Sequence, residues 1–223
     1  MKGTLLANTA LFRGTSSLEA EAMLNCLGAM ERGYAKGEQI YHSGDYVTDL
    51  GMVLSGSILI QTDDLWGNTT VLDKIGPGQI FAETYACVPG EPLMVDVVAA
   101  EESQVLFLNV ERVLQVCPAT CAPHSKLVRN LLLLSAQKKL NLSRKIFHTA
   151  SKTIRGRLLS YLSYQARRSG SPSFTVPFNR QQLADYLNVE RSALSNELSK
   201  MQRDGLLVVE RNRFTLTSDL SHL

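Results

Sequence analysis

The chain has 223 residues, of which 44% are hydrophobic and 20% charged, and its formal net charge is +2. This length and apolar content suit about two domains, each with a core of its own. No segment approaches the roughly 18 consecutive apolar residues of a membrane span, and the N-terminal apolar stretch is too short for a secretion signal. We therefore expect a cytoplasmic protein with no membrane partner. The 4 scattered cysteines, too few for a dense disulfide framework, agree with a reducing compartment.

Charge is divided unevenly along the chain. Residues 1–124 hold 6 lysines and arginines against 15 acidic residues, a net charge of −9, whereas residues 125–223 hold 17 against 6, a net charge of +11. A positive field of this kind attracts phosphate backbones and makes their binding depend on salt. The pattern predicts that the second part binds nucleic acid, although charge alone also fits a solvated basic face.

The first thirty residues have a helical pattern, with a cap at Ser16 or Ser17 and apolar residues at helical spacing: Leu18, Met23, Leu24, Leu27 and Met30. Residues 33–108 differ, because short apolar or alternating runs are separated there by glycines. The runs predict strands at 39–41, 52–54, 57–60, 70–72, 95–98 and 105–108. Short strands with glycine turns at this spacing indicate an antiparallel sandwich or barrel.

A long helix is predicted over 123–150, with Leu127, Leu131, Leu134, Leu140 and Ile146 on one side. This is more apolar surface than a helix resting on its own domain needs. A dimer seam is therefore the favoured interpretation, and a helix buried wholly within its own chain is the alternative. A further helix over 153–168 and a short strand over 173–178 open the basic region.

Residues 180–199 read RQQLADYLNVERSALSNELS and predict a helix-turn-helix. The residues expected to face inward are Leu183, Ala184, Leu187, Val189, Leu194 and Leu198. Asn188 suits the left-handed conformation of the turn, and Glu190 or Arg191 opens the second helix. Gly205 then closes that helix, and residues 206–216 predict a hairpin that turns at 211–213. The pattern is typical of a winged helix, and an ordinary helical hairpin in a bundle is the alternative.

Several short segments resemble one known family. They are IYHSGD at 40–45, GMVLSGSI at 51–58, GQIFAE at 78–83, RQQLA at 180–184 and VERS at 189–192. In this order and spacing, over nearly the whole chain, they resemble the family of the cyclic-AMP receptor protein and the fumarate-nitrate reduction regulator, the Crp/Fnr family. The resemblance implies an α+β chain. Its parts would be an antiparallel β-roll of the jelly-roll, cyclic-nucleotide-binding type with N-terminal helices at 1–122, a dimerisation helix at 123–150 and a winged helix-turn-helix domain at 151–223.

The resemblance also implies a mechanism and partners. In such regulators, a ligand or redox event in the roll shifts the dimer helices and reorients the DNA-binding domains. The implied state is a homodimer on a palindromic operator in double-stranded DNA, with RNA polymerase as a further partner and no enzymatic activity. The physical requirement is that the effector binds one arrangement more tightly than the other.

Arg191 matches the family arginine that reads guanine at the start of the recognition helix. Ser192 and Asn196 stand where relatives often carry glutamate and arginine, so we expect an unfamiliar operator sequence. Arg180, Lys200 and Arg213 are expected to contact the DNA backbone. The complete predicted DNA-binding set is Arg180, Gln181, Glu190, Arg191, Ser192, Asn196, Lys200 and Arg213.

The effector pocket departs from the cyclic-nucleotide pattern. Nucleotide-binding members show glycine-glutamate and, about ten residues later, arginine followed by serine or threonine; here Ala82 precedes Glu83, and Met94-Val95 occupies the later position. No arginine or lysine lies between Lys74 and Arg112, so we predict that cyclic AMP does not bind tightly. The residues Phe81, Glu83, Tyr85, Met94 and Val95 instead suggest an apolar, aromatic or weakly anionic effector of unknown identity. Alternatively these residues fill the roll, with Glu83 in a structural role.

The cysteines give a second hypothesis. An iron-sulfur sensor is disfavoured, because such members cluster three cysteines near the N-terminus and this chain has only Cys26 there. Cys117, Cys121 and His124 would share one face of a continuous helix, and thiols with imidazole suit zinc or a redox switch. Two prolines interrupt that helix. We therefore favour structural cysteines, predict no metal site, and keep a redox- or metal-responsive regulator as the alternative.

Two other classes of protein compete with a DNA-binding regulator. A jelly-roll enzyme of the cupin type needs several histidines and a carboxylate around one metal, whereas the chain has only 4 histidines and no paired motif in the roll. A ligand-binding protein that does not bind DNA would use its helix-turn-helix for protein contacts. Salt-dependent binding to duplex DNA separates this last class from the regulator.

Overall fold

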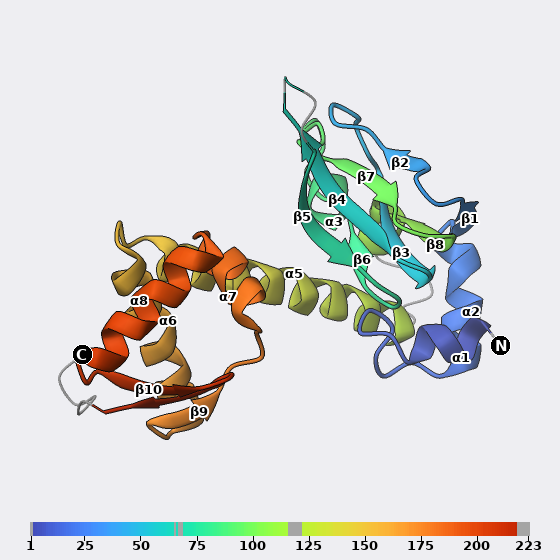
Figure 1. Ribbon diagram of the computed structural model, residues 1–223. Helices are drawn as coiled ribbons and strands as arrows, with labels where there is room; N and C mark the ends of the chain where they lie inside the picture. The colour runs from blue at the N-terminus through green and yellow to red at the C-terminus, as the bar shows by residue number, and fades with distance from the viewer. Residues whose placement is uncertain (1, 65, 67–68, 116–121, 218–223) are drawn as a thin grey trace. The chain divides into compact units, whose positions relative to one another are not determined.

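The computed structural model describes residues 2–64, 66, 69–115 and 122–217 (Figure 1). The chain divides into two compact units, Met1–Gln137 and Lys138–Leu223, and each is described by itself. The sequence predicted three parts with different functions, which meet at residues 122 and 150, and these boundaries stay a prediction.

The first unit contains a β-roll of two antiparallel sheets, each with four strands among the described residues. One sheet has the order β1 (Met30–Tyr34), β8 (Ser103–Asn109), β3 (Asp49–Ser55) and β6 (Ile80–Phe81). The other has the order β2 (Gln39–Tyr41), β7 (Asp96–Ala99), β4 (Ile58–Asp63) and β5 (Thr69–Ile75). The predicted antiparallel class and all six predicted strand regions are confirmed.

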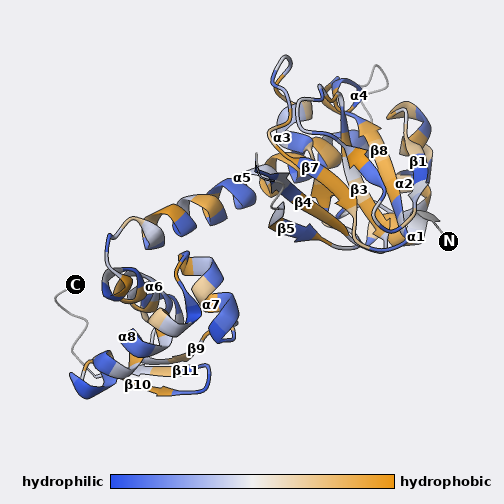
Figure 2. Ribbon diagram, turned by 45° about the horizontal axis from the view of Figure 1, so that its top comes forward, coloured by the Kyte–Doolittle hydropathy of each residue, from blue (hydrophilic) through white to orange (hydrophobic). Residues whose placement is uncertain are grey.

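Strands β3 and β8 bury both of their faces, which explains their nearly continuous apolar sequences (Figure 2). Val53, Val105 and Phe107 point into the roll, where they pack with residues of the second sheet. Met52 and Leu106, one position away, belong to a second core that contains the N-terminal helices and the start of the long helix. The alternation follows from the two-residue period of a strand.

The N-terminal helices are α1 (Lys2–Ala7) and α2 (Ser17–Cys26). Ser16 caps α2 in a capping box with Glu19, which confirms one of the two predicted caps. The predicted helical run was too long, because Met30 opens β1 and its partner in β8 is Phe107. Leu18 lies in α2, as its spacing predicted, and is 81% exposed. Two short helices, α3 (Glu83–Ala86) and α4 (Val110–Leu114), complete the first unit.

The long helix α5 covers Ala122–Thr149, close to the predicted range. Leu127 and Leu131 are buried in the core of the first unit. Further along, large apolar side chains are exposed on the single chain: Leu132, Leu133, Leu140, Leu142, Ile146 and Phe147. The prediction of surplus apolar surface on this helix is confirmed, whereas Leu140 and Ile146 lie on the exposed surface and do not share the buried face of Leu127.

The second unit contains the helices α6 (Ile154–Ser169), α7 (Arg180–Leu187) and α8 (Arg191–Arg203), and a sheet in the order β10 (Leu207–Glu210), β11 (Arg213–Leu216) and β9 (Ser173–Thr175). Strand β9 is shorter than the predicted 173–178, because Pro177 has no N–H for a ladder. Residues Leu183, Ala184, Leu187, Leu194 and Leu198 are buried and Val189 packs against them, as predicted. The winged helix-turn-helix is confirmed.

Candidate nucleic-acid interface

The turn between α7 and α8 is built by local backbone chemistry. Asn179 and Gln182 form a capping box at the start of α7, with both bonds at 2.9 Å. Asn188 ends α7 in the left-handed conformation with φ 54°, as its residue type predicted. Glu190 is the N-cap of α8, so that Arg191 is the first residue of the second helix.

Arg157 of α6 holds the end of α7 in place. Its Nη1 donates to the carbonyl oxygens of Leu187 at 3.0 Å and Asn188 at 2.8 Å, while its Nε donates to the carbonyl oxygen of Ser151 at 2.8 Å. The last carbonyls of a helix have no partner within the helix and carry partial negative charge, so a guanidinium there satisfies and stabilises them. Arg157 therefore positions the turn between α7 and α8, a role that its place in the sequence did not predict.

Arg155 of α6 holds α8 through two side-chain carboxylates. Its Nε lies 2.6 Å from Oε1 of Glu197, and its Nη2 lies 2.7 Å from Oδ2 of Asp204. The two carboxylates are seven residues apart, two turns of α8, and so lie on one side of the helix. The sequence signal for this contact is the seven-residue spacing of the two acidic residues together with an arginine at the start of α6.

The solvent side of α8 carries short polar side chains. Arg191, Ser192, Asn196 and Lys200 are exposed, and Ser195 is partly buried. Ser195 donates its hydroxyl hydrogen to the carbonyl oxygen of Arg191 at 3.0 Å. On the opposite side, Leu194, Leu198 and Met201 are buried in the core of the unit. The helix therefore presents one polar stripe to solvent, with Arg191 as its long cationic side chain at the N-terminal end.

Two further predicted residues lie at the start of α7. Gln181 is exposed, and its Nε2 donates to Oδ1 of Asp185 at 2.8 Å. Arg180 is partly buried, because its guanidinium carbon lies 5.2 Å from the centre of the Phe214 ring. Burial lowers the pKa of Arg180 from its usual value. The cation is held over an aromatic face beside a surface pocket that Asn179, Arg180 and Arg211 help to line.

The wing is the β10–β11 hairpin. Glu210 pairs with Arg213, so the turn consists of Arg211 and Asn212 and is tighter than the predicted 211–213. Arg211 has φ 57° at the tip, whereas Arg213 lies inside β11, where its Nε donates to Oγ of Ser173 at 3.2 Å. Arg211 is thus the basic residue at the tip, and it was absent from the predicted DNA-binding set.

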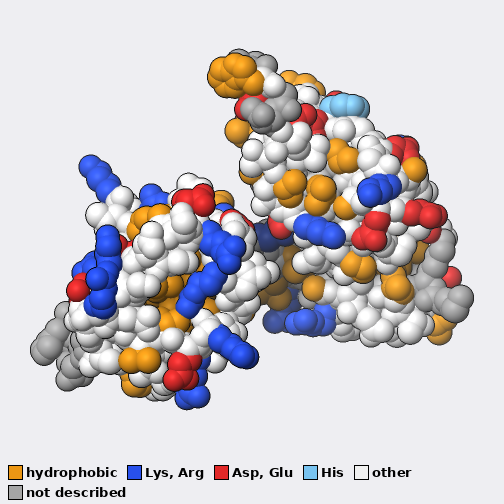
Figure 3. All heavy atoms as spheres, in the orientation of Figure 1, with side chains coloured by type: hydrophobic (Ala, Val, Ile, Leu, Met, Phe, Trp, Pro, Cys, Tyr) orange, Lys and Arg blue, Asp and Glu red, His pale blue; other side chains and the backbone are white. Residues whose placement is uncertain are grey.

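The face of the second unit seen in Figure 3 carries many lysine and arginine side chains. Their concentration agrees with the charge of +11 over residues 125–223. The structure therefore brings most of the predicted DNA-binding residues onto three neighbouring elements, α7, α8 and the wing. Arg155 and Arg157 are exceptions among the basic residues, because their charges are used within the unit.

The predicted effector residues lie in different environments. Phe81 is buried, and its ring meets those of Tyr41 and Phe107 edge to face at 6.2 and 6.3 Å. Glu83 is also buried, whereas Tyr85 and Val95 are partly buried. Met94 is 76% exposed. Phe81 therefore has a packing role, the alternative that the sequence left open, and the pocket itself stays a prediction.

The candidate metal or redox residues are described only in part. Cys117 and Cys121 lie outside the described residues. His124 is buried, and its Nε2 lies 2.7 Å from the carbonyl oxygen of Val113, to which it donates. Within the described part of the chain, no group of three or more His, Cys, Asp or Glu residues could hold a metal ion. No described helix is long and apolar enough to cross a membrane.

The two units match two family models. Residues 31–119 match the cyclic nucleotide-binding domain, and residues 156–223 match the Crp-like helix-turn-helix domain. The transcriptional activator protein FnrL of Cereibacter sphaeroides is 25% identical over 204 residues, which cover 86% of this chain and 78% of FnrL. The cyclic AMP receptor protein of Thermus thermophilus is 24% identical over 202 residues, which cover 91% of this chain and 89% of that protein.

A solved structure agrees with the fold. The structure titled OCPA complexed CprK superposes with a TM-score of 0.61 at 16% identity, covering 91% of this chain and 94% of CprK. The two domain matches occur in the order expected from the sequence motifs, and the relatives align over most of their length. The chain therefore belongs to the Crp/Fnr family of transcription regulators, with an effector-binding domain of the cyclic-nucleotide-binding type followed by a DNA-binding helix-turn-helix domain.

Proposed function

We propose that the protein is a homodimeric, effector-responsive transcription regulator that reads a palindromic operator with α8. The main support for this proposal is the polar stripe of α8, which begins at Arg191. Arg155 fixes the same helix through its ion pairs with Glu197 and Asp204. A helix of this kind enters the major groove with its N-terminal residues toward the base edges. RNA polymerase is the expected partner at the promoter, and the cytoplasm the expected location.

Arg191 is the residue that reads sequence most strongly in this proposal. A guanidinium donates in a fork to O6 and N7 of guanine, which contributes about 1–3 kcal/mol of base discrimination. Asn196 reads adenine or binds a phosphate, and Ser192 and Glu190 border the same stripe. Gln181, Arg180, Lys200 and Arg213 contact the backbone. Arg180 is suited to this task because the Phe214 ring limits its freedom before DNA arrives.

The homodimer is supported by the exposed apolar surface of α5. Leu133, Leu140 and Phe147 recur at intervals of seven residues and are all exposed on the single chain. A seven-residue apolar repeat is the pattern with which two helices pack along a common seam. Replacing Leu140 with glutamate should convert the dimer into a monomer in sedimentation experiments, whereas the same replacement at exposed Leu18, outside α5, should leave the dimer intact.

The effector is proposed to be a small molecule other than cyclic AMP. A cyclic phosphate is ordinarily bound by the guanidinium of an arginine, which donates two hydrogen bonds to it. The segment between Lys74 and Arg112 contains no lysine or arginine. The packed ring of Phe81 and the apolar interior of the roll favour an uncharged or weakly anionic ligand. Micromolar binding of cyclic AMP in calorimetry would contradict this part of the proposal.

Selection of binding sites from a random duplex library tests the proposal as a whole. The purified full-length chain should enrich a two-fold symmetric sequence, and its affinity for that sequence should fall steeply as salt increases. If no sequence is enriched and all duplexes bind equally weakly, the alternative class is favoured, namely a ligand-binding protein that does not bind DNA.

A further inference from the structure

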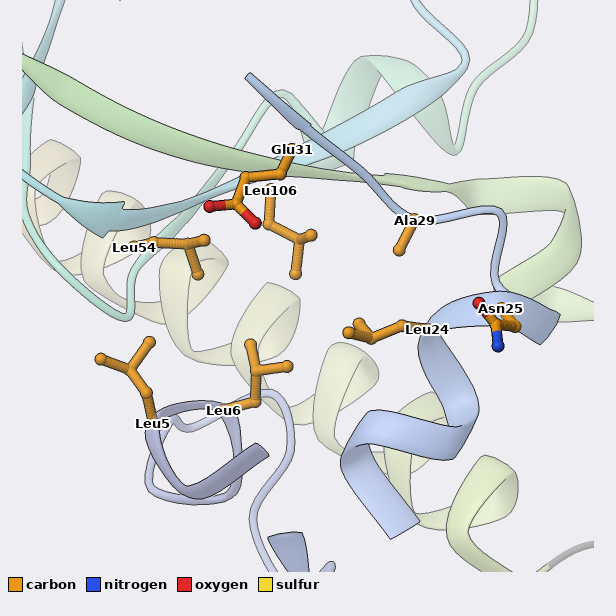
Figure 4. A pocket seen from close by; sticks show the side chains of 8 residues that line it. All are labelled: Leu5, Leu6, Leu24, Asn25, Ala29, Glu31, Leu54 and Leu106. Carbon is orange, nitrogen blue, oxygen red and sulfur yellow. The ribbon is translucent and has the colours of Figure 1, made fainter. Parts of the chain in front are cut away.

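The first unit has a pocket of about 250 Å³ between the N-terminal helices and the β1–β8–β3–β6 sheet (Figure 4). Leucine side chains make up most of its lining, and Glu31 is its one charged residue. Because Glu31 already has an interaction within the described residues, the pocket presents no free charge that would select a ligand. In the second unit, by contrast, α8 carries side chains whose polar groups are free to select a partner.

The first two turns of α8 contain five polar side chains: Arg191, Ser192, Ser195, Asn196 and Glu197. These N-terminal turns are the part of a recognition helix that reaches the base edges. Two of the five are already used inside the unit. Glu197 binds Arg155 at 2.6 Å. The hydroxyl of Ser195 donates its one hydrogen to the carbonyl oxygen of Arg191 at 3.0 Å.

The other three side chains are available to a partner. Arg191, Ser192 and Asn196 are exposed, and within the described residues their side chains have no hydrogen bond or ion pair. They differ in chemistry. The guanidinium of Arg191 donates two parallel hydrogen bonds, which match O6 and N7 of guanine. The hydroxyl of Ser192 rotates and both donates and accepts, so it suits several base edges equally well.

Asn196 has a free amide, in which a donor and an acceptor lie side by side. Adenine presents the complementary pair in the major groove, the N6 amino donor and the N7 acceptor, so an asparagine binds it through two hydrogen bonds. A phosphate would use only the amide nitrogen and would leave the carbonyl oxygen beside a negative charge. The amide of Asn196 is therefore better matched to adenine than to the DNA backbone.

Ser195 is poorly suited to discriminate between bases. Since its hydrogen is bonded to the backbone of α8, the hydroxyl is left with acceptor lone pairs only. Such a group accepts from the amino group of adenine and of cytosine alike. Within the first two turns of α8, side chains that can form a fixed two-bond pattern with a base are thus limited to Arg191 and Asn196.

The spacing of these two residues relates them to the base pairs. Arg191 and Asn196 are five residues apart in α8, which corresponds to about 7.5 Å along the helix axis. Base pairs are stacked about 3.4 Å apart. When the helix lies along the groove, the two side chains therefore reach bases about two base pairs apart. Ser192 and Ser195 lie between them in the helix.

We propose that α8 recognises each half-site of the operator mainly through two base pairs, with Arg191 bound to a guanine and Asn196 bound to an adenine about two base pairs away. The base pair between them is read only weakly. This two-base recognition rests on the proposed function, since it requires α8 to lie in the major groove.

The test uses the full-length chain and the symmetric duplex that selection from a random library enriches. Competition anisotropy measures the affinity after each base pair of one half-site is replaced in turn. Replacing the guanine or the adenine pair should weaken binding by about 5-fold to 150-fold, and replacing the pair between them by less than about 5-fold. Substitution of the adenine by 7-deazaadenine, which lacks the N7 acceptor, should also weaken binding.

Two neighbouring variants separate base recognition from other contacts. Asn196→Ala should lose discrimination at the adenine position and keep it at the guanine position, and it should bind the 7-deazaadenine duplex as tightly as the unmodified one. Ser195→Ala is the matched control and should keep the wild-type pattern at every position, because its hydroxyl is used within the helix. Alanine favours the helical conformation at both positions, so both variants should fold.

The outcomes distinguish this inference from the proposed function. Equal weakening of all duplexes by Asn196→Ala would identify a phosphate contact and overturn the two-base recognition. A changed base preference in Ser195→Ala, or strong discrimination at the pair between the two bases, would overturn it as well. In these cases an enriched symmetric duplex leaves the proposed function intact, whereas a selection that enriches no symmetric sequence contradicts both.

Discussion

The Nε atom of Arg155 in α6 lies 2.6 Å from Oε1 of Glu197 in α8, inside the DNA-binding unit. The same guanidinium binds Asp204 at 2.7 Å, so one side chain contacts α8 at two points two turns apart. Hydrogen bonding to these two carboxylates raises the pKa of Arg155. The ion pairs hold α8 in place without occupying its polar stripe, the proposed DNA-binding surface.

Arg155→Ala should therefore weaken operator binding although Arg155 contacts no base. Once α8 is less firmly oriented, we expect affinity to fall about threefold to tenfold. Fluorescence anisotropy with the selected operator measures the change. Arg168→Ala removes the same charge from exposed α6 surface and controls for the general field; equal losses in the two variants would show that orientation of α8 plays no part.

Arg191→Ala should abolish sequence preference and leave salt-sensitive residual binding. The reason is that bidentate base contacts specify sequence, whereas the remaining cations still attract phosphates. We expect the ratio of operator to random-duplex affinity to fall by about 1–3 kcal/mol. Competition anisotropy against random duplex measures this ratio. A variant that keeps the wild-type ratio would remove Arg191 from its assigned role.

Gly51→Ala should destabilise the β-roll. A Cβ at Gly51 would overlap the ring of Phe81, which is fixed between Tyr41 and Phe107. Overpacking of this kind costs about 1–3 kcal/mol, measured as the free energy of unfolding in urea. Gly76→Ala is the matched control, because its nearest neighbour would be Gln79 Oε1 at an ordinary 3.6 Å.

Replacing Phe81 with leucine, whose side chain is smaller and has no ring, should partly rescue this loss. The double variant Gly51→Ala with Phe81→Leu is expected to be more stable than the sum of the two single changes implies, because the two positions share one contact. Additive losses would mean that Phe81 moves aside freely, which would reopen a role for its ring in ligand binding.

His148 should make stability depend on pH. It is 1% exposed, and its ring lies 5.1 Å from that of Tyr164 and 5.5 Å from that of Tyr161. Within the described residues its Nε2 has no hydrogen-bond partner, while Nδ1 lies 3.2 Å from the hydroxyl of Ser160. Burial, and to a lesser degree the cation of Arg144, lower the pKa of His148 from its usual 6.5.

The sign of the effect follows from this direction. As the pH falls through about 6.5, the imidazole of His148 becomes protonated in the unfolded chain but stays neutral in the folded chain. The free energy of unfolding therefore decreases. Above that pH the contribution is constant. The slope from one group is at most about 1.4 kcal/mol per pH unit. Urea unfolding of wild type and His148→Gln between pH 8 and 5.5 measures it, and parallel profiles would contradict the prediction.

Much of the fold was predictable because local interactions determine it. The left-handed Asn188, the start of α8 beside Glu190 and the cap at Ser16 each follow from a few neighbouring residues. The short apolar runs of β3 and β8 likewise predicted strands. The errors arose at ends of elements, where Met30 left the helical pattern to pair with Phe107, a residue distant in sequence.

The sequence by itself determined the family, the order of the domains, the basic DNA-binding half and the surface position of Arg191. Only the tertiary structure decided which arginines are already engaged within the unit, because the partners of Arg155 and Arg157, apart from Ser151, lie 30 to 49 residues away. It also decided that Phe81 is a packed core residue. Such contacts depend on the geometry of packed elements, which neither composition nor periodicity records.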